Sequence, residues 1–250
     1  MAAGEVLVLW DIDHTLVDAG GLGTHLYGMV FTALFGRDLP AVAPMAGRTD
    51  RAIITETLAM AGIADPGAHV AAFIERLARE APAFGERVRR RGRVLPGAAE
   101  AMTALALDGS VHQSVLTGNI RPLAEVKLGA LGLGGHLDLD IGAFGDTHEV
   151  RAELAHLARE RAAAATGHEF AGESTVLVGD TPLDVAAAIA TGARAVGVAT
   201  GRYREADLAA AGAHAVLPGL SGTARVLAAV TGRSGPEGPE DAQDAQDAAG

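Results

Sequence analysis

Apolar runs along the chain alternate with segments of helical periodicity. Short apolar runs bounded by Gly, Pro or Asp are typical of buried strands, and most of the stretches between them repeat apolar residues every three or four positions. This alternation predicts a doubly wound, Rossmann-like α/β fold, with a parallel sheet covered by helices on both faces. We expect the strands at residues 6–10, 114–117, 137–143, 175–179, 195–199 and 215–217.

The stretch between the first and second expected strands is much longer than a single crossover requires. Apolar residues recur there at helical spacing around residues 26–35, 54–58 and 70–77, and no strand pattern interrupts them. We therefore predict an α-helical insert that lies over the carboxyl end of the first strand. The predicted organisation is an α/β core of residues 1–17 and 95–231, with the insert at residues 18–94.

The last part of the chain has a different composition. Residues 232–250 contain one Arg and five acidic residues, and Gly, Pro, Ala and Gln make up most of the remainder. Such a segment cannot bury enough apolar surface to offset the entropy lost on ordering. We therefore predict a disordered acidic tail.

Composition and charge exclude several classes of function. The chain has 250 residues, 49% of them hydrophobic, a net charge of −11 and no Cys. The negative charge argues against a nucleic-acid partner, because duplex binding relies on Lys and Arg contacts to phosphate. The lack of Cys excludes thiol nucleophiles and cysteine metal sites. No apolar run reaches the ~18 residues of a membrane span, so we expect a cytoplasmic protein without membrane contact. The sequence does not indicate its oligomeric state.

Two acidic residues follow the first expected strand, in the segment Asp11-Ile12-Asp13-His14-Thr15. Asp11 and Asp13 are two positions apart on extended backbone and therefore project to the same side, at the strand end where α/β sheets bind ligands. Two ionised carboxylates this close repel each other unless a proton or a cation lies between them. The segment predicts a metal site or acid–base chemistry; the alternative is an acidic loop without chemistry.

A second acidic pair, Asp180 and Asp184, follows the expected strand at residues 175–179. Thr181 and Pro182 suit a helix start, so a capping box is one interpretation of Asp184. Asp180 precedes the helix and is expected to point into the same crevice as Asp11. Several carboxylates that converge there would repel one another without a divalent cation, and an all-oxygen site fits Mg²⁺.

A third segment, Thr117-Gly118-Asn119, follows the second expected strand. A hydroxyl group, a Gly that allows close approach to backbone N–H groups, and a helix beginning near Pro122 suit an anion such as phosphate, although alone the segment is only a turn. Lys127 on that helix is the single Lys of the chain. It marks a place that needs a compact ammonium group, or it is a surface Lys with its stem over apolar residues.

In this order, the segments resemble the motifs of the haloacid dehalogenase superfamily, specifically its Mg²⁺-dependent phosphatases in the phosphoglycolate phosphatase and β-phosphoglucomutase-like group. The resemblance covers the chain up to about residue 230 and implies that the insert is the family's cap. It further implies a nucleophile, Asp11, a general acid and base, Asp13, a phosphoryl-binding Thr117, and Mg²⁺ held by Asp11, the backbone carbonyl of Asp13, Asp180 and Asp184.

The chain departs from the family pattern at two places. Position 14 is usually Gly but is His14 here, which could crowd the loop, touch the substrate or face solvent. The family's basic residue more often falls near residues 148–151, where this chain has no Lys. We assign the basic role to Lys127, with Arg151 as the alternative.

The resemblance implies hydrolysis of a small phosphorylated metabolite through an aspartyl phosphate. Asp13 must be protonated when the leaving alkoxide departs and ionised when water attacks, so a raised pKa of Asp13 is expected. Asp13 argues against dehalogenases, which generally lack it, and the absence of Lys from the insert argues against phosphonatases. A phosphomutase of the β-phosphoglucomutase type and a weakly catalytic regulator that binds a phosphorylated metabolite are the alternatives.

Substrate selection is expected in the segment Gly47-Arg48-Thr49-Asp50-Arg51, which resembles the family's cap substrate loop. Arg48 or Arg51 could grip a carboxylate or a second phosphate of the substrate, and Gly118 and Asn119 are expected to contact the substrate as well. The alternative is that Thr49 caps the following helix while Arg51 is solvated.

Overall fold

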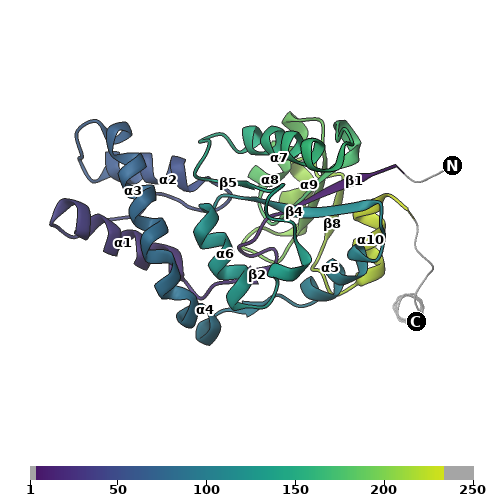
Figure 1. Ribbon diagram of the computed structural model, residues 1–250, viewed down its shortest axis with the longest axis horizontal. Coiled ribbons are helices and arrows are strands. Elements are labelled where there is room, and N and C mark those ends of the chain that lie inside the picture. Colours follow the sequence, from purple (N-terminus) through teal and green to yellow (C-terminus); the bar gives the residue numbers. More distant parts are fainter. Residues whose placement is uncertain (1–3, 234–250) are drawn as a thin grey trace.

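The structure is a computed structural model that describes residues 4–233, so the predicted tail lies outside the described residues except for its first two positions. Six parallel strands form the main sheet in the order β5-β4-β1-β6-β7-β8. The order reverses at β1, which has β4 on one side and β6 on the other, and this is the place where such sheets bind ligands. The predicted doubly wound α/β fold is therefore confirmed (Figure 1). The strands are β1 (Val6–Trp10), β4 (Val111–Thr117), β5 (Ala143–Phe144), β6 (Thr175–Gly179), β7 (Arg194–Val198) and β8 (Ala215–Leu217).

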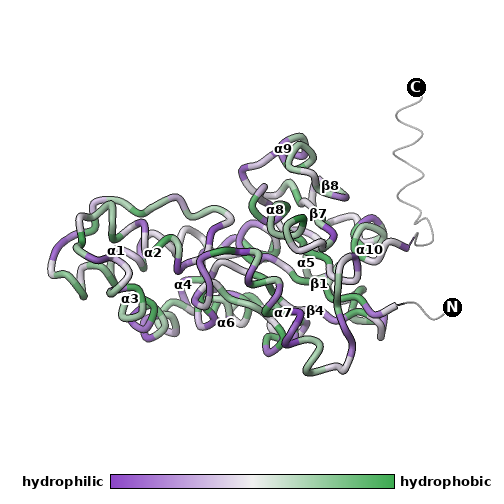
Figure 2. Tube along the Cα trace, turned by 90° about the horizontal axis from the view of Figure 1, so that it is seen from above, coloured by the Kyte–Doolittle hydropathy of each residue, from purple (hydrophilic) through white to green (hydrophobic). Residues whose placement is uncertain are grey.

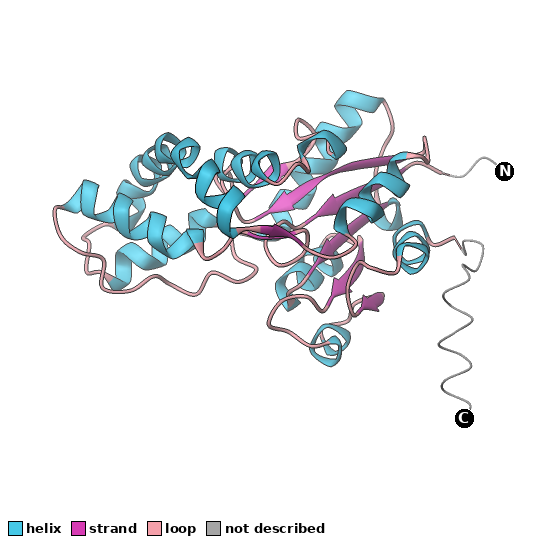
Figure 3. Cartoon of the chain, turned by 90° about the horizontal axis from the view of Figure 1, so that it is seen from below, coloured by secondary structure: helices cyan, strands magenta, loops and turns pink. Residues whose placement is uncertain are grey.

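Helices cover both faces of this sheet (Figure 3). Alternate residues of β1 show the two faces: Val8 and Trp10 belong to one buried cluster, with residues of α5, α6 and α10, whereas Leu7 and Leu9 belong to another, with residues of α7, α8 and α9. A strand buried on both faces explains the unbroken apolar run at residues 6–10. The helices and short 3-10 turns of this part are α5 (Ala98–Ala106), α6 (Arg121–Ala130), η2 (Gly134–His136), α7 (Arg151–Thr166), η3 (Gly172–Ser174), α8 (Pro182–Ala190), α9 (Glu205–Ala210) and α10 (Thr223–Thr231).

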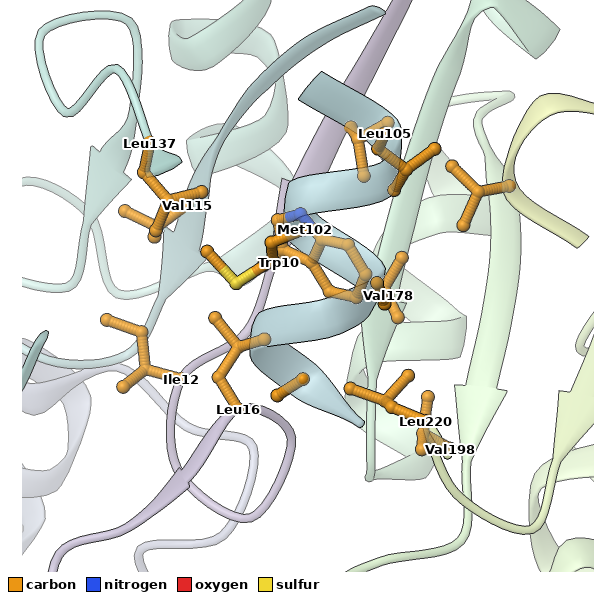
Figure 4. Packing of buried hydrophobic residues seen from close by; sticks show 14 of the residues in the cluster. Trp10, Ile12, Leu16, Met102, Leu105, Val115, Leu137, Val178, Val198 and Leu220 are labelled. Atoms are coloured by element: carbon orange, nitrogen blue, oxygen red, sulfur yellow. The ribbon is translucent and has the colours of Figure 1, made fainter. Parts of the chain in front are cut away.

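Trp10 fixes the end of β1, directly before Asp11. Its side chain is fully buried and packs against Met102 of α5 and Val178 of β6 (Figure 4). The indole Nε1 donates a hydrogen bond to Gln113 Oε1 at 3.2 Å, and Gln113 Nε2 donates to the backbone oxygen of Met102 at 2.9 Å. Because a buried indole N–H needs a partner, this chain of bonds holds the last residue of β1 in one position.

The predicted insert is helical and has its own hydrophobic core. Its large buried side chains include Phe31, Ile54 and Phe73, which form one cluster that also takes in Ile120 and Leu123 from α6 and the turn before it. The insert therefore packs on α6 and extends from one end of the sheet (Figure 1), and Figure 2 shows apolar and polar positions alternating along its helices. Its elements are α1 (Leu22–Phe35), α2 (Asp50–Met60), α3 (Pro66–Glu80), η1 (Ala81–Phe84) and α4 (Gly85–Arg91).

A short two-stranded ribbon closes the base of the insert. β2 (Val17–Asp18) and β3 (Arg93–Val94) are antiparallel, and Arg93 Nη2 lies 2.8 Å from Asp18 Oδ2. The ribbon lies where we expect the chain to leave and re-enter the core, although pairs of residues are too short to give a strand pattern. The domain boundaries themselves stay a prediction. In the described part of the chain, residues 4–233, no helix is both long enough and apolar enough to cross a bilayer.

The expected strand at residues 137–143 is wrong over most of its length, since β5 comprises only Ala143–Phe144. The residues before it form turns: Asp138 Oδ1 accepts a hydrogen bond from the backbone N–H of Asp140 at 3.0 Å. The alternation of apolar and acidic residues there has another cause. Leu137 and Ile141 anchor the loop in the clusters on the two faces of the sheet, and the acidic residues between them favour turns.

Candidate active site

Three polar residues expected in the site lie at neighbouring strand ends. Asp11 directly follows β1, Thr117 is the last residue of β4, and Asp180 directly follows β6. Because β1 lies between β4 and β6 in a parallel sheet, the carboxyl ends of these strands meet at one edge. All three side chains are buried. The predicted common crevice is therefore present.

The carboxylates of Asp11, Asp180 and Asp184 form a buried cluster, with one oxygen of each within 4.8 Å of the others. Burial raises the pKa of Asp11 to about 7, an effect that Asp184 reinforces and Arg151 opposes. Burial and the charges of Asp11 and Asp184 raise the pKa of Asp180 to about 8. One guanidinium does not balance three carboxylates, and an all-oxygen donor set with this excess negative charge fits Mg²⁺.

Asp184 uses its two carboxylate oxygens differently. Oδ2 accepts hydrogen bonds from the backbone N–H of Thr181 at 3.0 Å and from its hydroxyl at 2.7 Å, while Thr181 Oγ1 accepts from the Asp184 N–H at 3.3 Å. Oδ1 forms an ion pair with Arg151. Asp184 therefore completes the capping box of α8 and also belongs to the acidic cluster.

Arg151, at the start of α7, is the cation that contacts Asp11. Its Nη2 donates to Asp11 Oδ1 at 2.9 Å and to the Leu116 backbone oxygen at 3.1 Å, and its side chain is only 7% exposed. The alternative residue for the basic role therefore lies against the expected nucleophile. Lys127 has a different partner.

Lys127 binds Asp13. Its Nζ donates to Asp13 Oδ1 at 2.8 Å, to Asp13 Oδ2 at 2.6 Å and to Asn119 Oδ1 at 2.7 Å. Asn119 Nδ2 in turn donates to Asp13 Oδ2 at 2.7 Å and to Thr117 Oγ1 at 2.9 Å. Lys127 is buried, so the surface-lysine interpretation is wrong. These contacts join four of the expected site residues in one network.

The pKa of Asp13 shifts in the opposite direction to our expectation. Burial raises it, but the charge and hydrogen bonds of Lys127, together with the bond from Asn119, outweigh burial and hold the pKa below its ordinary value. The sequence-based expectation considered only the neighbouring carboxylates. It missed the ammonium group 114 positions further along the chain.

His14 has a left-handed backbone conformation, with φ of 61°. This conformation explains why Gly is usual at the position, because a side chain costs about 1 kcal/mol there. The His14 carbonyl accepts a hydrogen bond from the Thr200 hydroxyl. The side chain is exposed and lines the rim of the cavity described next.

The core and the insert line one cavity of about 290 Å³. The core contributes Asp11 and Asp180 of the acidic cluster, Arg151, Asp13, Lys127 and the segment 117–119. The insert contributes apolar side chains, together with Asp18, Thr24, Tyr27, Arg48 and Asp50. The core side of the cavity is therefore highly charged, and the insert side mixes apolar and polar side chains.

The loop before α2 docks on the core. The backbone N–H of Asp50 donates to the Gly118 oxygen at 2.7 Å, and that of Arg51 donates to the Gly145 oxygen at 2.9 Å. The buried Asp50 carboxylate accepts from the Ile120 N–H at 2.8 Å and from the Tyr27 hydroxyl at 2.6 Å. Burial raises the pKa of Asp50 despite these bonds. The loop thus links the insert to the segment that carries Asn119.

The two arginines of this loop have different places. Arg48 lines the cavity, but its Nη1 lies 2.7 Å from Glu56 Oε2 and donates to the Pro44 oxygen at 3.1 Å. Arg51 is not among the residues that line the cavity, and its Nη1 donates to the Asp146 oxygen at 3.3 Å. Thr49 Oγ1 accepts from the Ala52 N–H at 3.2 Å and so caps α2, as one interpretation of the sequence predicted.

Sequence reasoning missed Tyr27, Asp50 and Gly201. Asp50 was named only as part of the loop 47–51, and Tyr27 and Gly201 were not singled out. At Gly201, a Cβ would lie 1.8 Å from Asp180 Oδ2, so only Gly lets the loop after β7 pass this carboxylate. Only the fold reveals these contacts, because each joins residues far apart in the chain.

Gly118→Ala tests the docking of the insert loop. A Cβ at Gly118 would lie 1.9 Å from the Arg48 backbone oxygen, so we expect the free energy of unfolding to fall by about 1–3 kcal/mol. Gly129→Ala on α6, where a Cβ has open space, should instead stabilise the helix by up to about 1 kcal/mol. Urea titration measures both. Equal stability of Gly118→Ala and the wild type would contradict the docked arrangement.

Comparisons with known proteins identify the family and the fold of this chain. A sequence profile described as haloacid dehalogenase-like hydrolase matches residues 8–188. A search of curated proteins found no significant match. Among solved structures, a predicted phosphatase from Clostridium acetobutylicum shares 18% identity with a TM-score of 0.60, covering 86% of this chain and 94% of its own.

Two further solved structures have the same fold. CbbY from Rhodobacter sphaeroides, solved in complex with phosphate, has 20% identity, a TM-score of 0.57 and coverage of 87% of this chain and 96% of its own. A protein from Thermotoga maritima, provisionally assigned as a β-phosphoglucomutase, has 22% identity, a TM-score of 0.55 and coverage of 89% and 98%. The profile match spans well over half of the sequence, and the chain therefore belongs to the haloacid dehalogenase-like hydrolase family.

Proposed function

We propose that this protein is a Mg²⁺-dependent phosphatase that hydrolyses a small phosphorylated metabolite through an aspartyl-phosphate intermediate on Asp11. The observation that carries the proposal is the buried cluster of Asp11, Asp180 and Asp184, of which Asp11 and Asp180 line a cavity together with Asp13. The phosphate bound in the structurally similar CbbY supports an anion site in this fold.

In the proposed first step, a carboxylate oxygen of Asp11 attacks phosphorus and the bond from phosphorus to the ester oxygen breaks. Because Lys127 and Asn119 lower the pKa of Asp13 in the free site, Asp13 first takes a proton from the phosphate monoanion of the incoming substrate, and it then gives this proton to the departing oxygen, so the alcohol leaves neutral. In the second step Asp13 takes a proton from water, the water oxygen bonds to phosphorus, and the phosphorus bond to Asp11 breaks. Phosphate and both carboxyl groups are thereby regenerated.

Attack of a carboxylate on a phosphate ester brings two anions together. Asp11, Asp180, Asp184 and the backbone carbonyl of Asp13 would hold Mg²⁺, which when bound offsets this repulsion and the charge that develops on the phosphoryl oxygens. Arg151 orients Asp11 through the 2.9 Å hydrogen bond. Lys127 adds positive charge beside Asp13, where the phosphoryl group must lie for proton transfer.

Thr117 and Asn119 are the proposed phosphoryl-binding residues on the second strand. The Thr117 hydroxyl accepts from Asn119 Nδ2 at 2.9 Å, which leaves its own proton free to donate to a phosphoryl oxygen. Gly118 allows the insert loop to approach and close the cavity above them. Exclusion of water by this loop would strengthen each charge interaction at the phosphoryl group.

The proposal is tested by phosphate release from p-nitrophenyl phosphate with Mg²⁺ present. We expect turnover to fall on the order of a thousandfold on chelation with EDTA and to return with excess Mg²⁺. Absence of turnover with every divalent cation would overturn the proposal and favour a regulator that only binds the metabolite.

A phosphomutase is the second candidate, because a similar structure carries that provisional assignment. The two reactions differ in their products. A phosphatase accumulates free phosphate from a sugar monophosphate, whereas a mutase accumulates the isomeric ester. Isomer formation without free phosphate would replace the phosphatase assignment.

A further inference from the structure

We propose that the insert side of the cavity selects phosphate esters whose leaving group is uncharged, such as a small neutral alcohol or polyol. The inference rests on the proposed phosphatase function and names the substrate class of that site. It excludes leaving groups that carry a carboxylate or a second phosphate.

The cations around the cavity are already matched by carboxylates. Among the described residues that line it, the Lys and Arg side chains are Arg48, Lys127 and Arg151. Lys127 is paired with Asp13, and Arg151 with the acidic cluster, so both belong to the phosphoryl end. Arg48 is therefore the cation that the insert contributes.

Arg48 is itself neutralised within the insert. Its Nη1 lies 2.7 Å from Glu56 Oε2 and donates to the Pro44 oxygen at 3.1 Å, while Nη2 donates to the Ala52 oxygen at 3.4 Å. A carboxylate of the substrate would have to displace Glu56 from the guanidinium. This arrangement argues against the anion-gripping role that the sequence suggested for Arg48.

Acidic residues add to the cost of a second negative charge. Asp18 and Asp50 also line the cavity. Asp18 is paired with Arg93, whereas Asp50 is buried and hydrogen-bonded to Tyr27 and to the Ile120 N–H, without an ion pair among the described residues. An anionic leaving group would meet these carboxylates without an unmatched Lys or Arg among the described residues that line the cavity, and burial of an unpaired charge is strongly unfavourable.

The other groups on this side suit a carbon skeleton with hydroxyl groups. Thr24 and Tyr27 offer hydroxyls to an alcohol, and 290 Å³ is at the small end of the range for ligand pockets. A phosphate monoester of a few carbon atoms is therefore the expected size. The apolar side chains that line this side are Ala19, Leu26, Met45, Ala46, Ile53 and Leu123.

Matched pairs of esters test the inference on the full-length protein with Mg²⁺. The pairs are glycerol 3-phosphate with 3-phosphoglycerate, and 2-hydroxyethyl phosphate with 2-phosphoglycolate, whose members differ mainly in a hydroxyl or a carboxylate. Each ester competes with p-nitrophenyl phosphate, and its kcat/KM and inhibition constant are measured. We expect the uncharged member to bind and to react at least about tenfold better in both pairs.

Glu56→Gln provides the residue-level test, because it frees the Arg48 guanidinium and removes one negative charge beside it. We expect kcat/KM for 3-phosphoglycerate to rise about threefold or more, with little change for glycerol 3-phosphate and p-nitrophenyl phosphate. Glu75→Gln, which breaks the exposed Arg79 pair elsewhere in the insert, is the matched control. A merely structural role of Glu56 would lower all three activities together.

The possible outcomes distinguish a failure of the proposed phosphatase function from a failure of the inference about the leaving group. If p-nitrophenyl phosphate is not hydrolysed, the proposed function itself is wrong. If it is hydrolysed but the charged members compete equally well or better, or if neither member of a pair competes, the inference about the leaving group is wrong while the phosphatase assignment stands.

Discussion

The Asp11→Asn variant is expected to hydrolyse p-nitrophenyl phosphate about 10⁴-fold more slowly than the wild type, or slower still. An amide oxygen is a poor nucleophile, and without the Asp11 carboxylate no aspartyl phosphate forms. The substitution also removes one of the three clustered carboxylates, so the affinity for Mg²⁺ should fall as well. Initial rates at saturating Mg²⁺ separate the loss of the nucleophile from the loss of metal affinity.

Loss of folding would not explain such a result. Burial and Asp184 raise the pKa of Asp11 to about 7, although Arg151 opposes them, so the ionised carboxylate is unfavourable in the folded protein without metal. An uncharged Asn relieves this repulsion, and its side-chain oxygen still accepts the bond from Arg151. We therefore expect a metal-free melting temperature that is no lower than that of the wild type.

The exposed Asp140, paired with Arg121 on the surface, supplies the control. Asp140→Asn makes the same chemical change at an exposed position outside the cluster and should leave turnover within about twofold of the wild type. Asp11→Asn activity above about one per cent of the wild-type rate would exclude Asp11 as the nucleophile.

The second large effect is expected for Asp13→Asn, and the loss in its first step should depend on the leaving group. An alkoxide needs a proton to depart, so turnover of a small alkyl phosphate should fall about 10²–10⁴-fold. A nitrophenolate leaves without a proton, so the first step with p-nitrophenyl phosphate should persist. The second step, in which Asp13 takes a proton from water, should become slow for both substrates.

Rapid-mixing absorbance measurements detect this difference. Asp13→Asn should give a burst of nitrophenolate equal to one equivalent of enzyme, followed by a slow steady phase. Lys127→Met is a useful companion, because Lys127 donates to both oxygens of Asp13, and its loss should slow the reaction without the same dependence on the leaving group. An equal loss on alkyl and aryl esters, without a burst, would contradict the acid–base role of Asp13.

The sequence predicted the strands that are buried on both faces. Their unbroken apolar runs have one cause, burial, and residues 6–10 and 175–179 became β1 and β6 as expected. The strand predicted at residues 137–143 was wrong because Leu137 and Ile141 are buried as anchors of a loop rather than as strand residues. The spacing of apolar residues shows which positions are buried, but it does not show whether the backbone there forms the hydrogen bonds of a strand.

The acidic part of the site was also predictable, because each acidic segment follows a strand. Asp11 and Asp180 had to meet once β1 and β6 were neighbours in a parallel sheet. The pairing of cations with acids was not predictable in this way. Lys127 reaches Asp13 and Arg151 reaches Asp11 because of how α6 and α7 pack, which one sequence does not specify.

Contacts between the insert and the core were the least accessible to sequence reasoning. Asp50 accepts from Tyr27 in another helix of the insert and from Ile120 at the start of α6. No local pattern distinguishes such a carboxylate from an ordinary first-turn acid. The ion pair between Arg48, in the loop before α2, and Glu56 of α2 likewise depends on side-chain direction.

Covalent phosphorylation of Asp11 is the central feature of the proposed mechanism, and acid-quench trapping measures it directly. The Asp13→Asn variant is mixed with Mg²⁺ and p-nitrophenyl phosphate, stopped with acid during the slow phase, digested and analysed by mass spectrometry. The mechanism predicts one phosphoryl group on the peptide that contains Asp11. A phosphoryl group on another residue, or a burst of nitrophenolate without any phosphorylated peptide, would contradict it.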